Sequence, residues 1–156
     1  MATPSEIKDR IVILAGNVSG VTTSLDDYPE GEPPFTTAQL PAMVTRLYQA
    51  PATRAFLSSD MYTVTRTFTM LLHVAETKEE VLDPDTATME SCETFLRLVP
   101  NYFAQRNRLG DATTPLADMV YDCELMRDEG IRKILRDKKA YWGVVFRLPV
   151  IESENF

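Results

Sequence analysis

The chain has few of the residues on which most enzyme sites depend. Of its 156 residues one is a histidine, His73, and two are cysteines, Cys92 and Cys123. Any Ser-His-Asp triad, Cys-His pair or multi-histidine metal site would have to run through His73 alone. The cysteines make neither a disulfide framework nor a CxxC metal pair, so we expect two reduced, partly buried thiols.

Glycine is also scarce, with six in the whole chain, and the sequence contains no GxGxxG, GxxxxGK[ST], GxSxG or HExxH motif. Nucleotide binding, α/β-hydrolase chemistry and zinc proteolysis therefore have no sequence support. A metal-dependent hydrolase would need Asp118, Asp122 and Glu124, a spacing that a chain with 23 acidic residues also produces by chance. We expect no enzymatic activity, no catalytic residue, no metal ligand and no cofactor.

Positive charge is in deficit, because 16 Lys and Arg stand against 23 Asp and Glu and give a net charge of −7. This balance argues against a protein that binds nucleic acid by neutralising phosphates. Long apolar runs are missing too, and none reaches the roughly 18 residues of a membrane-spanning helix. The first sixteen residues lack the basic-then-apolar order of a secretion signal. We therefore expect neither a membrane nor a secreted location.

What is present is an ordinary globular composition, 44% hydrophobic and 25% charged, which predicts one domain over residues 1–156. Thr3, Pro4 and Glu6 form a helix start, with a capping residue, a proline at the first position and a capping-box glutamate. An apolar stripe at helical spacing follows: Ile7, Ile11, Leu14, Ala15 and Val18.

Residues 19–37 are rich in Asp, Glu and Pro, which predicts a long acidic loop without helix or strand. Loops of this length are uncommon in compact domains. Two interpretations stay open: a solvated connector, or a loop that becomes ordered against a partner chain.

Period-2 patterns predict strands at 42–48 and 62–74, joined by a hairpin loop over 51–60. The second strand has an apolar face and a face of alternating threonines, which suits either solvent or a neighbouring subunit. A second helix follows, starting at Asp83-Pro84 or at Thr88, and Pro100 predicts a kink or two shorter helices.

The last forty residues predict a strand over 119–126, a turn at 128–130, a short strand over 131–135 and a closing strand over 141–151. Pro149 indicates an edge position or a bulge for the closing strand. The order of elements predicts an α+β fold, a largely antiparallel or mixed sheet of four to five strands with two main helices packed on one face.

Four segments together carry a family resemblance. They are the N-terminal helix with its acidic loop, AQLPAMVTRLY at 38–48, YTVTRTFTMLLHVAE at 62–76 and DEGIRKILRDKKAYWGVVFRLPVIE at 128–152. In these segments and their order the chain resembles the tail terminator proteins of long-tailed bacteriophages.

The resemblance implies a homo-hexameric ring in the neck of the virion. Such a ring caps the completed tail tube, stops polymerisation of the tube protein and offers a surface to a head-completion or connector protein. Duplex DNA would pass through its pore without specific binding, which agrees with an acidic chain. The alternatives are another neck subunit, such as a head-closure or connector protein, a small metal-dependent hydrolase, and a host-directed adaptor.

Candidate interface residues come from three regions. The basic cluster at 132–139 is either a flexible hairpin tip or a surface that meets the acidic loop of a neighbouring subunit. An Arg and an aromatic residue in the 51–60 loop are of the kind that anchors interfaces. The strand edge at 141–151 or 42–48 is expected to pair with a neighbour. The candidates are Asp26, Asp27, Glu30, Glu32, Arg54, Phe56, Arg132, Arg136, Lys138, Lys139 and Trp142.

Overall fold

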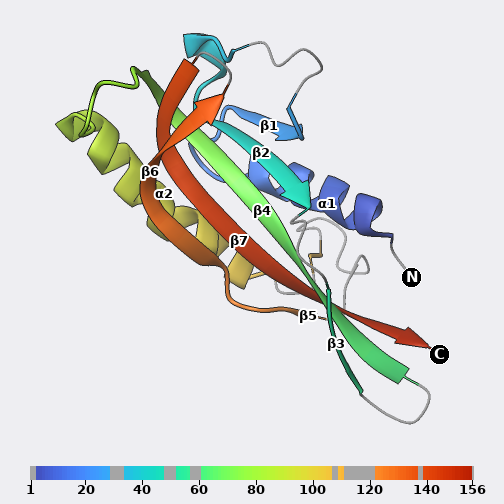
Figure 1. The fold of residues 1–156 in the computed structure, drawn as a ribbon. Helices are drawn as coiled ribbons and strands as arrows, with labels where there is room; N and C mark the ends of the chain where they lie inside the picture. Colours follow the sequence, from blue (N-terminus) through green and yellow to red (C-terminus); the bar gives the residue numbers. More distant parts are fainter. Residues whose placement is uncertain are drawn as a thin grey trace.

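The computed structural model of the chain (Figure 1) describes residues 3–28, 34–47, 52–56, 61–106, 109–110, 122–136 and 139–155. The helices in these residues are α1 (Pro4–Gly16), the short 3-10 helix η1 (Thr37–Gln39) and α2 (Thr86–Ala104). The strands are β1 (Thr23–Asp26), β2 (Ala42–Leu47), β3 (Thr53–Phe56), β4 (Met61–Thr77), β5 (Asp122–Cys123), β6 (Arg127–Arg136) and β7 (Lys139–Asn155).

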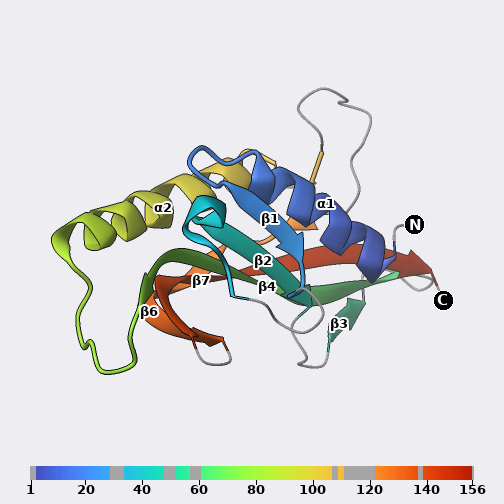
Figure 2. The same ribbon diagram turned by 90° about the horizontal axis from the view of Figure 1, so that it is seen from above.

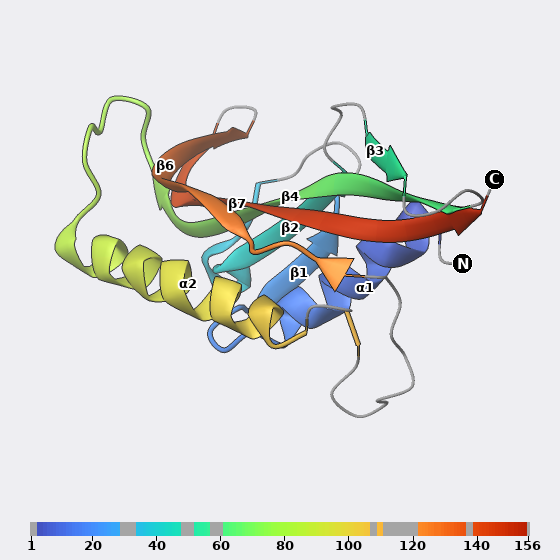
Figure 3. The same cartoon turned by 90° about the horizontal axis from the view of Figure 1, so that it is seen from below.

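The strands form one mixed sheet in the order β1-β2-β4-β7-β5, with β3 paired to β4 and β6 paired to β7. Only the pair of β1 and β2 is parallel among the described strands. At the centre, β4 and β7 have 17 residues each and pair along almost their whole length. Figures 2 and 3 show α1 and α2 on the same side of the sheet, which we call the helix face; the opposite side is the outer face. The predicted α+β class is confirmed, with seven strands in the described residues instead of four to five.

The N-terminal helix forms as its capping signature predicts. The Thr3 hydroxyl accepts a hydrogen bond from the Glu6 N–H at 3.2 Å, and Pro4 is the first helical residue. The predicted apolar stripe is buried against the helix face together with alternate residues of β4 and β7. This shared core positions α1 along β1 and β2.

The second helix begins at the cap residue Asp85, between the two predicted starts, because the Asp85 side chain accepts a hydrogen bond from the Thr88 N–H. Pro100 lies inside one helix, so the alternative of two shorter helices is wrong. Val99 and Phe103 are buried on either side of Pro100. We attribute the continuity of the helix to this packing, because tertiary burial offsets the lost backbone hydrogen bond.

The prediction of an acidic loop over 19–37 is wrong in part. Thr23–Asp26 is a strand that pairs in parallel with β2, and Thr37–Gln39 is a short 3-10 helix. The Ser24 hydroxyl also donates to the Val12 carbonyl at 2.6 Å, which attaches β1 to α1. A strand of four residues is too short to show a clear alternation in the sequence. It is stabilised by pairing with a neighbouring strand, which the local sequence does not reveal.

Two predicted turns are strands. Thr53–Phe56 lies in the expected 51–60 loop but pairs with β4. The expected turn at 128–130 lies inside β6, where the register shifts between Asp128 and Ile131 and Gly130 has φ 77°. A turn and a β-bulge can each require a residue with positive φ, so a glycine after two acidic residues is compatible with either structure.

The predicted edge position of the closing strand is wrong, since β7 lies between β4 and the strands β5 and β6. The Pro149 carbonyl accepts a hydrogen bond from the Glu124 N–H. Carbonyl and nitrogen of one residue point to the same side of a strand, so the missing N–H of Pro149 faces β5 and β6. On that side the described pairing is interrupted between Cys123 and Arg127, and the proline breaks no bond to β4.

Candidate functional site

A strongly acidic segment covers the end of β4, the following turn and the first part of α2. Residues 76–93, which we call the acidic end, contain seven carboxylates and one lysine, so they carry −6 of the net charge of −7. All seven of these carboxylate residues are exposed. They are Glu76, Glu79, Glu80, Asp83, Asp85, Glu90 and Glu93.

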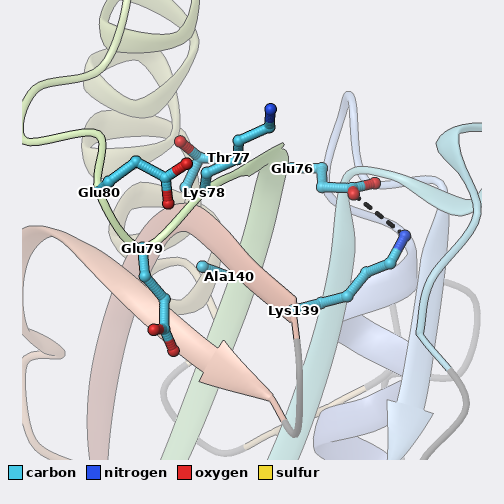
Figure 4. A pocket seen from close by; sticks show the side chains of 7 residues that line it. All are labelled: Glu76, Thr77, Lys78, Glu79, Glu80, Lys139 and Ala140. Carbon is cyan, nitrogen blue, oxygen red and sulfur yellow. Dashed lines mark ion pairs between the residues drawn. The ribbon is translucent and has the colours of Figure 1, made fainter.

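A pocket of about 300 Å³ opens at this end of the molecule (Figure 4). Its lining residues are Glu76, Thr77, Lys78, Glu79 and Glu80, with Lys139 and Ala140 from the start of β7. Lys139 Nζ lies 3.0 Å from Glu76 Oε1, as the dashed line in Figure 4 marks. This ion pair joins β7 to the turn at the rim of the pocket.

The turn after β4 is held by a lysine of β6. Lys133 Nζ donates to the backbone carbonyls of Lys78 at 3.0 Å, Glu79 at 2.9 Å and Val81. The same ammonium lies 5.2 Å from the centre of the Trp142 ring. Three carbonyl acceptors and an aromatic face give this cation a complete set of partners, and they tie the acidic turn to the sheet.

The start of α2 is held in a similar way. The Asp85 carboxylate accepts from the Thr88 N–H at 2.7 Å, and this hydrogen bond lowers the pKa of Asp85 below its usual value. The negative charge also lies at the positive end of the helix dipole. The acidic end therefore has a defined backbone at both of its borders.

A second cluster lies on the outer face, where aromatic rings surround two basic residues. Its apolar members are Phe35, Ala42, Val44 and Tyr141. The Arg136 guanidinium lies 4.2 Å from the centre of the Tyr28 ring and 4.3 Å from that of Phe35. Arg136 is only 3% exposed, and within the described residues none of its guanidinium nitrogens has a hydrogen-bond acceptor.

His73 is fully buried in the same cluster. Its Nδ1 donates to the Ala42 carbonyl at 3.2 Å, and its Nε2 accepts from the Tyr28 hydroxyl at 3.1 Å, because a carbonyl can only accept. Burial lowers the pKa of His73 to about 4, and the positive charge of Arg136 acts in the same direction. The imidazole is therefore neutral at pH 7 and serves to pack and orient its neighbours.

The structure places several of the sequence-predicted interface residues in pairs within the chain. Asp26 Oδ1 lies 2.8 Å from Lys8 Nζ, and Asp27 Oδ1 lies 3.3 Å from Arg46 Nε. Arg132 Nη1 lies 2.7 Å from Glu129 Oε2. The Arg54 side chain is exposed on β3, and Phe56 is the last residue of that strand. Glu30, Glu32 and Lys138 lie outside the described residues.

The prediction of an exposed basic tip at 132–139 is wrong for two of its members. Arg136 is buried between Tyr28 and Phe35, and Lys133 is bound to three carbonyls. Trp142, also a predicted interface residue, is only 8% exposed beneath Lys133. The prediction considered only neighbours in sequence, and a run of basic residues is usually exposed. The rings that cover Arg136 could not be foreseen in this way, because they lie about 100 residues earlier in the chain.

The two strands that were predicted to pair with a neighbouring subunit are not edge strands of the sheet. β7 is central, and β2 lies between β1 and β4. On their second sides, β1 pairs with Ala42–Thr45 of β2, and β5 and β6 pair with β7 within Lys139–Ile151. The prediction missed this because it omitted the short strand β1.

The threonine face of β4 lies on the outer face of the sheet. Thr63, Thr65, Thr67 and Thr69 are half-buried, and they pair in register with Ser153, Ile151, Pro149 and Arg147 of β7. Neither α1 nor α2 lies on this side (Figure 2). This leaves a row of uncharged hydroxyl side chains along the middle of the sheet.

The candidate hydrolase carboxylates show no metal geometry in the part of the chain that the structure describes, where no three His, Cys, Asp or Glu residues could hold an ion. Asp118 lies outside that part, Glu124 is exposed, and Asp122 accepts from the Cys123 N–H at 2.8 Å. Burial raises the pKa of Cys92 to about 11 and that of Cys123 to about 12. Both thiols are therefore protonated and poor nucleophiles at pH 7.

Comparison of the chain with known protein families finds no match, and comparison with curated proteins finds none either. Among the described residues, no helix has the length and apolar character needed to cross a membrane. The sequence alone gave the acidic end no role, although its seven carboxylates are visible within residues 76–93.

Proposed function

We propose that this chain is a ring-forming tail terminator of a long-tailed bacteriophage. In this role it is a structural protein of the virion neck that caps the tail tube, ends polymerisation of the tube protein and offers the surface that joins the head. It is not an enzyme and binds no cofactor. Duplex DNA passes through the ring without specific binding.

The observation that carries the proposal is the threonine face of β4. A closed ring needs contacts between two different surfaces of each subunit. A half-buried row of hydroxyl side chains without a helix over it suits such a contact. The two arginines in register with Thr69 at one end of the row, Arg46 and Arg147, already form ion pairs within the chain, with Asp27 and Glu129. Thr63, Thr65, Thr67 and Thr69 supply this face across the longest strand pair of the molecule.

The charge of the chain supports passage of DNA. Each subunit carries a net charge of −7, so a ring of such subunits repels a phosphate backbone. Strong, salt-sensitive binding of duplex DNA by the purified protein would contradict this part of the proposal.

The decisive experiment is electron microscopy of phage lysates in which this gene alone is interrupted. Overlong or irregular tubes without heads are expected, because nothing would then end tube growth. Tails of normal length beside filled, unattached heads would instead indicate a head-closure or connector protein. Intact, infectious particles would show that the chain is not part of the neck.

A further inference from the structure

We propose that the acidic end is a docking surface for a basic protein partner and that Leu82 is its apolar anchor. The proposal rests on the proposed function in one respect: the partner is an axial neighbour of the ring, stacked above or below it. The partner surface that fits is an apolar hollow surrounded by Lys and Arg side chains.

The distribution of charge is the first argument. Residues 76–93 hold seven acidic residues and one basic residue, whereas the rest of the chain holds 16 acidic and 15 basic residues. Lys133 and Lys139 lie against this segment and reduce the net charge of this end of the molecule from −6 to −4, which is still more than half of the −7 of the whole chain. The subunit therefore has one end that is more negative than the rest. Only a basic surface complements such an end, and complementary charge raises the association rate and selects the partner.

An exposed leucine in the middle of these charges is the second argument. Leu82 is 86% exposed and its neighbour Val81 is 38% exposed, and they lie between Glu80 and Asp83. An apolar side chain inside a charged rim is the usual arrangement of a protein interface, where a central anchor is buried and charges surround it.

The third argument is that the backbone around Leu82 is already ordered. Lys133 binds the carbonyls of Lys78, Glu79 and Val81 on one side, and Asp85 caps α2 on the other. Leu82 is thus presented from a short segment with both ends held. Preorganisation of this kind lowers the entropic cost of binding.

A second copy of the chain is a poor occupant. Outside the acidic end the chain is nearly neutral, and several of its basic residues are already paired, including Lys8, Arg46, Arg132 and Arg147. Contacts around the ring are therefore assigned to the threonine face, and the acidic end to a different protein along the tail axis.

The test measures binding of the full-length ring to two purified proteins from the same particle, the tube protein and the head-joining protein. Two variants alter the surface, Glu79→Lys/Glu80→Lys and Leu82→Ser. Two matched controls make the same chemical changes elsewhere, Asp9→Lys/Glu124→Lys for the exposed charges and Ile13→Ser for an apolar residue that is 61% exposed. Light scattering checks that every variant keeps the oligomeric state of the wild type.

The wild type is expected to bind one of the two proteins, and less tightly as salt screens the charges. Both surface variants should weaken that binding by about tenfold or more, while the controls stay close to the wild type. Unchanged binding of the surface variants would overturn the docking proposal alone. Loss of the ring in these variants would overturn it in favour of a contact between copies. A wild type that forms no ring and binds neither protein would overturn the proposed function as well.

Discussion

At the scale of single residues, His73 makes the stability of the protein depend on pH. Its pKa is about 4 in the fold and close to the usual 6.5 when unfolded, so between these values the unfolded chain binds more protons. Stability is therefore lost as the pH falls from about 6.5 to about 4. The difference of the two pKa values corresponds to about 3 kcal/mol.

Urea denaturation at a series of pH values checks this prediction, with His73→Asn as the variant that does not titrate. Asn retains an N–H donor for the Ala42 carbonyl, so the variant is expected to fold with lower stability at pH 7. Its free energy of unfolding should fall less steeply than that of the wild type between pH 6.5 and 4. Parallel curves would show that His73 is not the group responsible.

Arg136 offers a second prediction at this scale. Its guanidinium is desolvated and has two ring contacts but no acceptor among the described residues, so an apolar side chain of similar length should replace it with little loss. We expect Arg136→Met to stay within about 1 kcal/mol of the wild type, and Arg136→Glu to cost about 3 kcal/mol or more because it buries an unpaired carboxylate.

The pKa of His73 gives an independent test of the surroundings of Arg136. Since the charge of Arg136 lowers the pKa of His73, that pKa should rise in Arg136→Met. Titration of the imidazole by NMR measures it directly. An unchanged pKa would mean that the charge of Arg136 does not reach His73.

At the scale of the elements, the long patterns predicted the fold well and the short ones did not. The helix α1 and the strands β4 and β7 were predicted because their helical stripe or alternation spans many residues. The strands β1 and β3, with four residues each, are ordered by pairing with longer strands. Their order is therefore a tertiary effect, which local composition does not encode.

The site was less predictable than the fold for the same reason. The aromatic rings over Arg136 come from Tyr28 and Phe35, in a segment whose composition indicates a loop. The acidic end could have been singled out from the sequence, because its seven carboxylates lie within residues 76–93. Its ordered backbone could not, since Lys133 reaches it from a strand more than 50 residues later.

The bulge in the central strand pair gives a prediction at this scale. Gly143 pairs with His73, where the register between β4 and β7 shifts, and a Cβ at Gly143 would lie 1.9 Å from the Leu72 carbonyl oxygen. Because the obstacle is backbone in the middle of the sheet, we expect Gly143→Ala to cost about 3 kcal/mol. Gly130→Ala is the control. Its Cβ would meet no atom within 4 Å, so only the positive φ should lower the stability, by about 1 kcal/mol. Thermal unfolding compares the two, and equal losses would contradict the steric explanation.

At the scale of the whole molecule, the two proposed contact surfaces lie on different parts of the subunit, so they should be separable by mutation. The threonine face occupies residues 63–69 of β4 on the outer face of the sheet, whereas the acidic end begins at Glu76, near the end of that strand. A charge placed on the threonine face should therefore prevent ring formation without unfolding the monomer, because a solvent-facing strand position tolerates polar residues and a desolvated ring contact does not. The variant is Thr65→Arg/Thr67→Arg, and the control is Ala104→Arg at an exposed position on α2.

Size-exclusion chromatography with light scattering, on the isolated protein and on the protein added to tail tubes, measures the oligomeric state of both variants. The expected result is a folded monomer for Thr65→Arg/Thr67→Arg and the wild-type assembly for Ala104→Arg. Circular dichroism confirms that the strands are retained. A threonine-face variant that still assembles would exclude this face from the ring contact, because two buried arginines without partners would be too costly for a closed interface to accommodate.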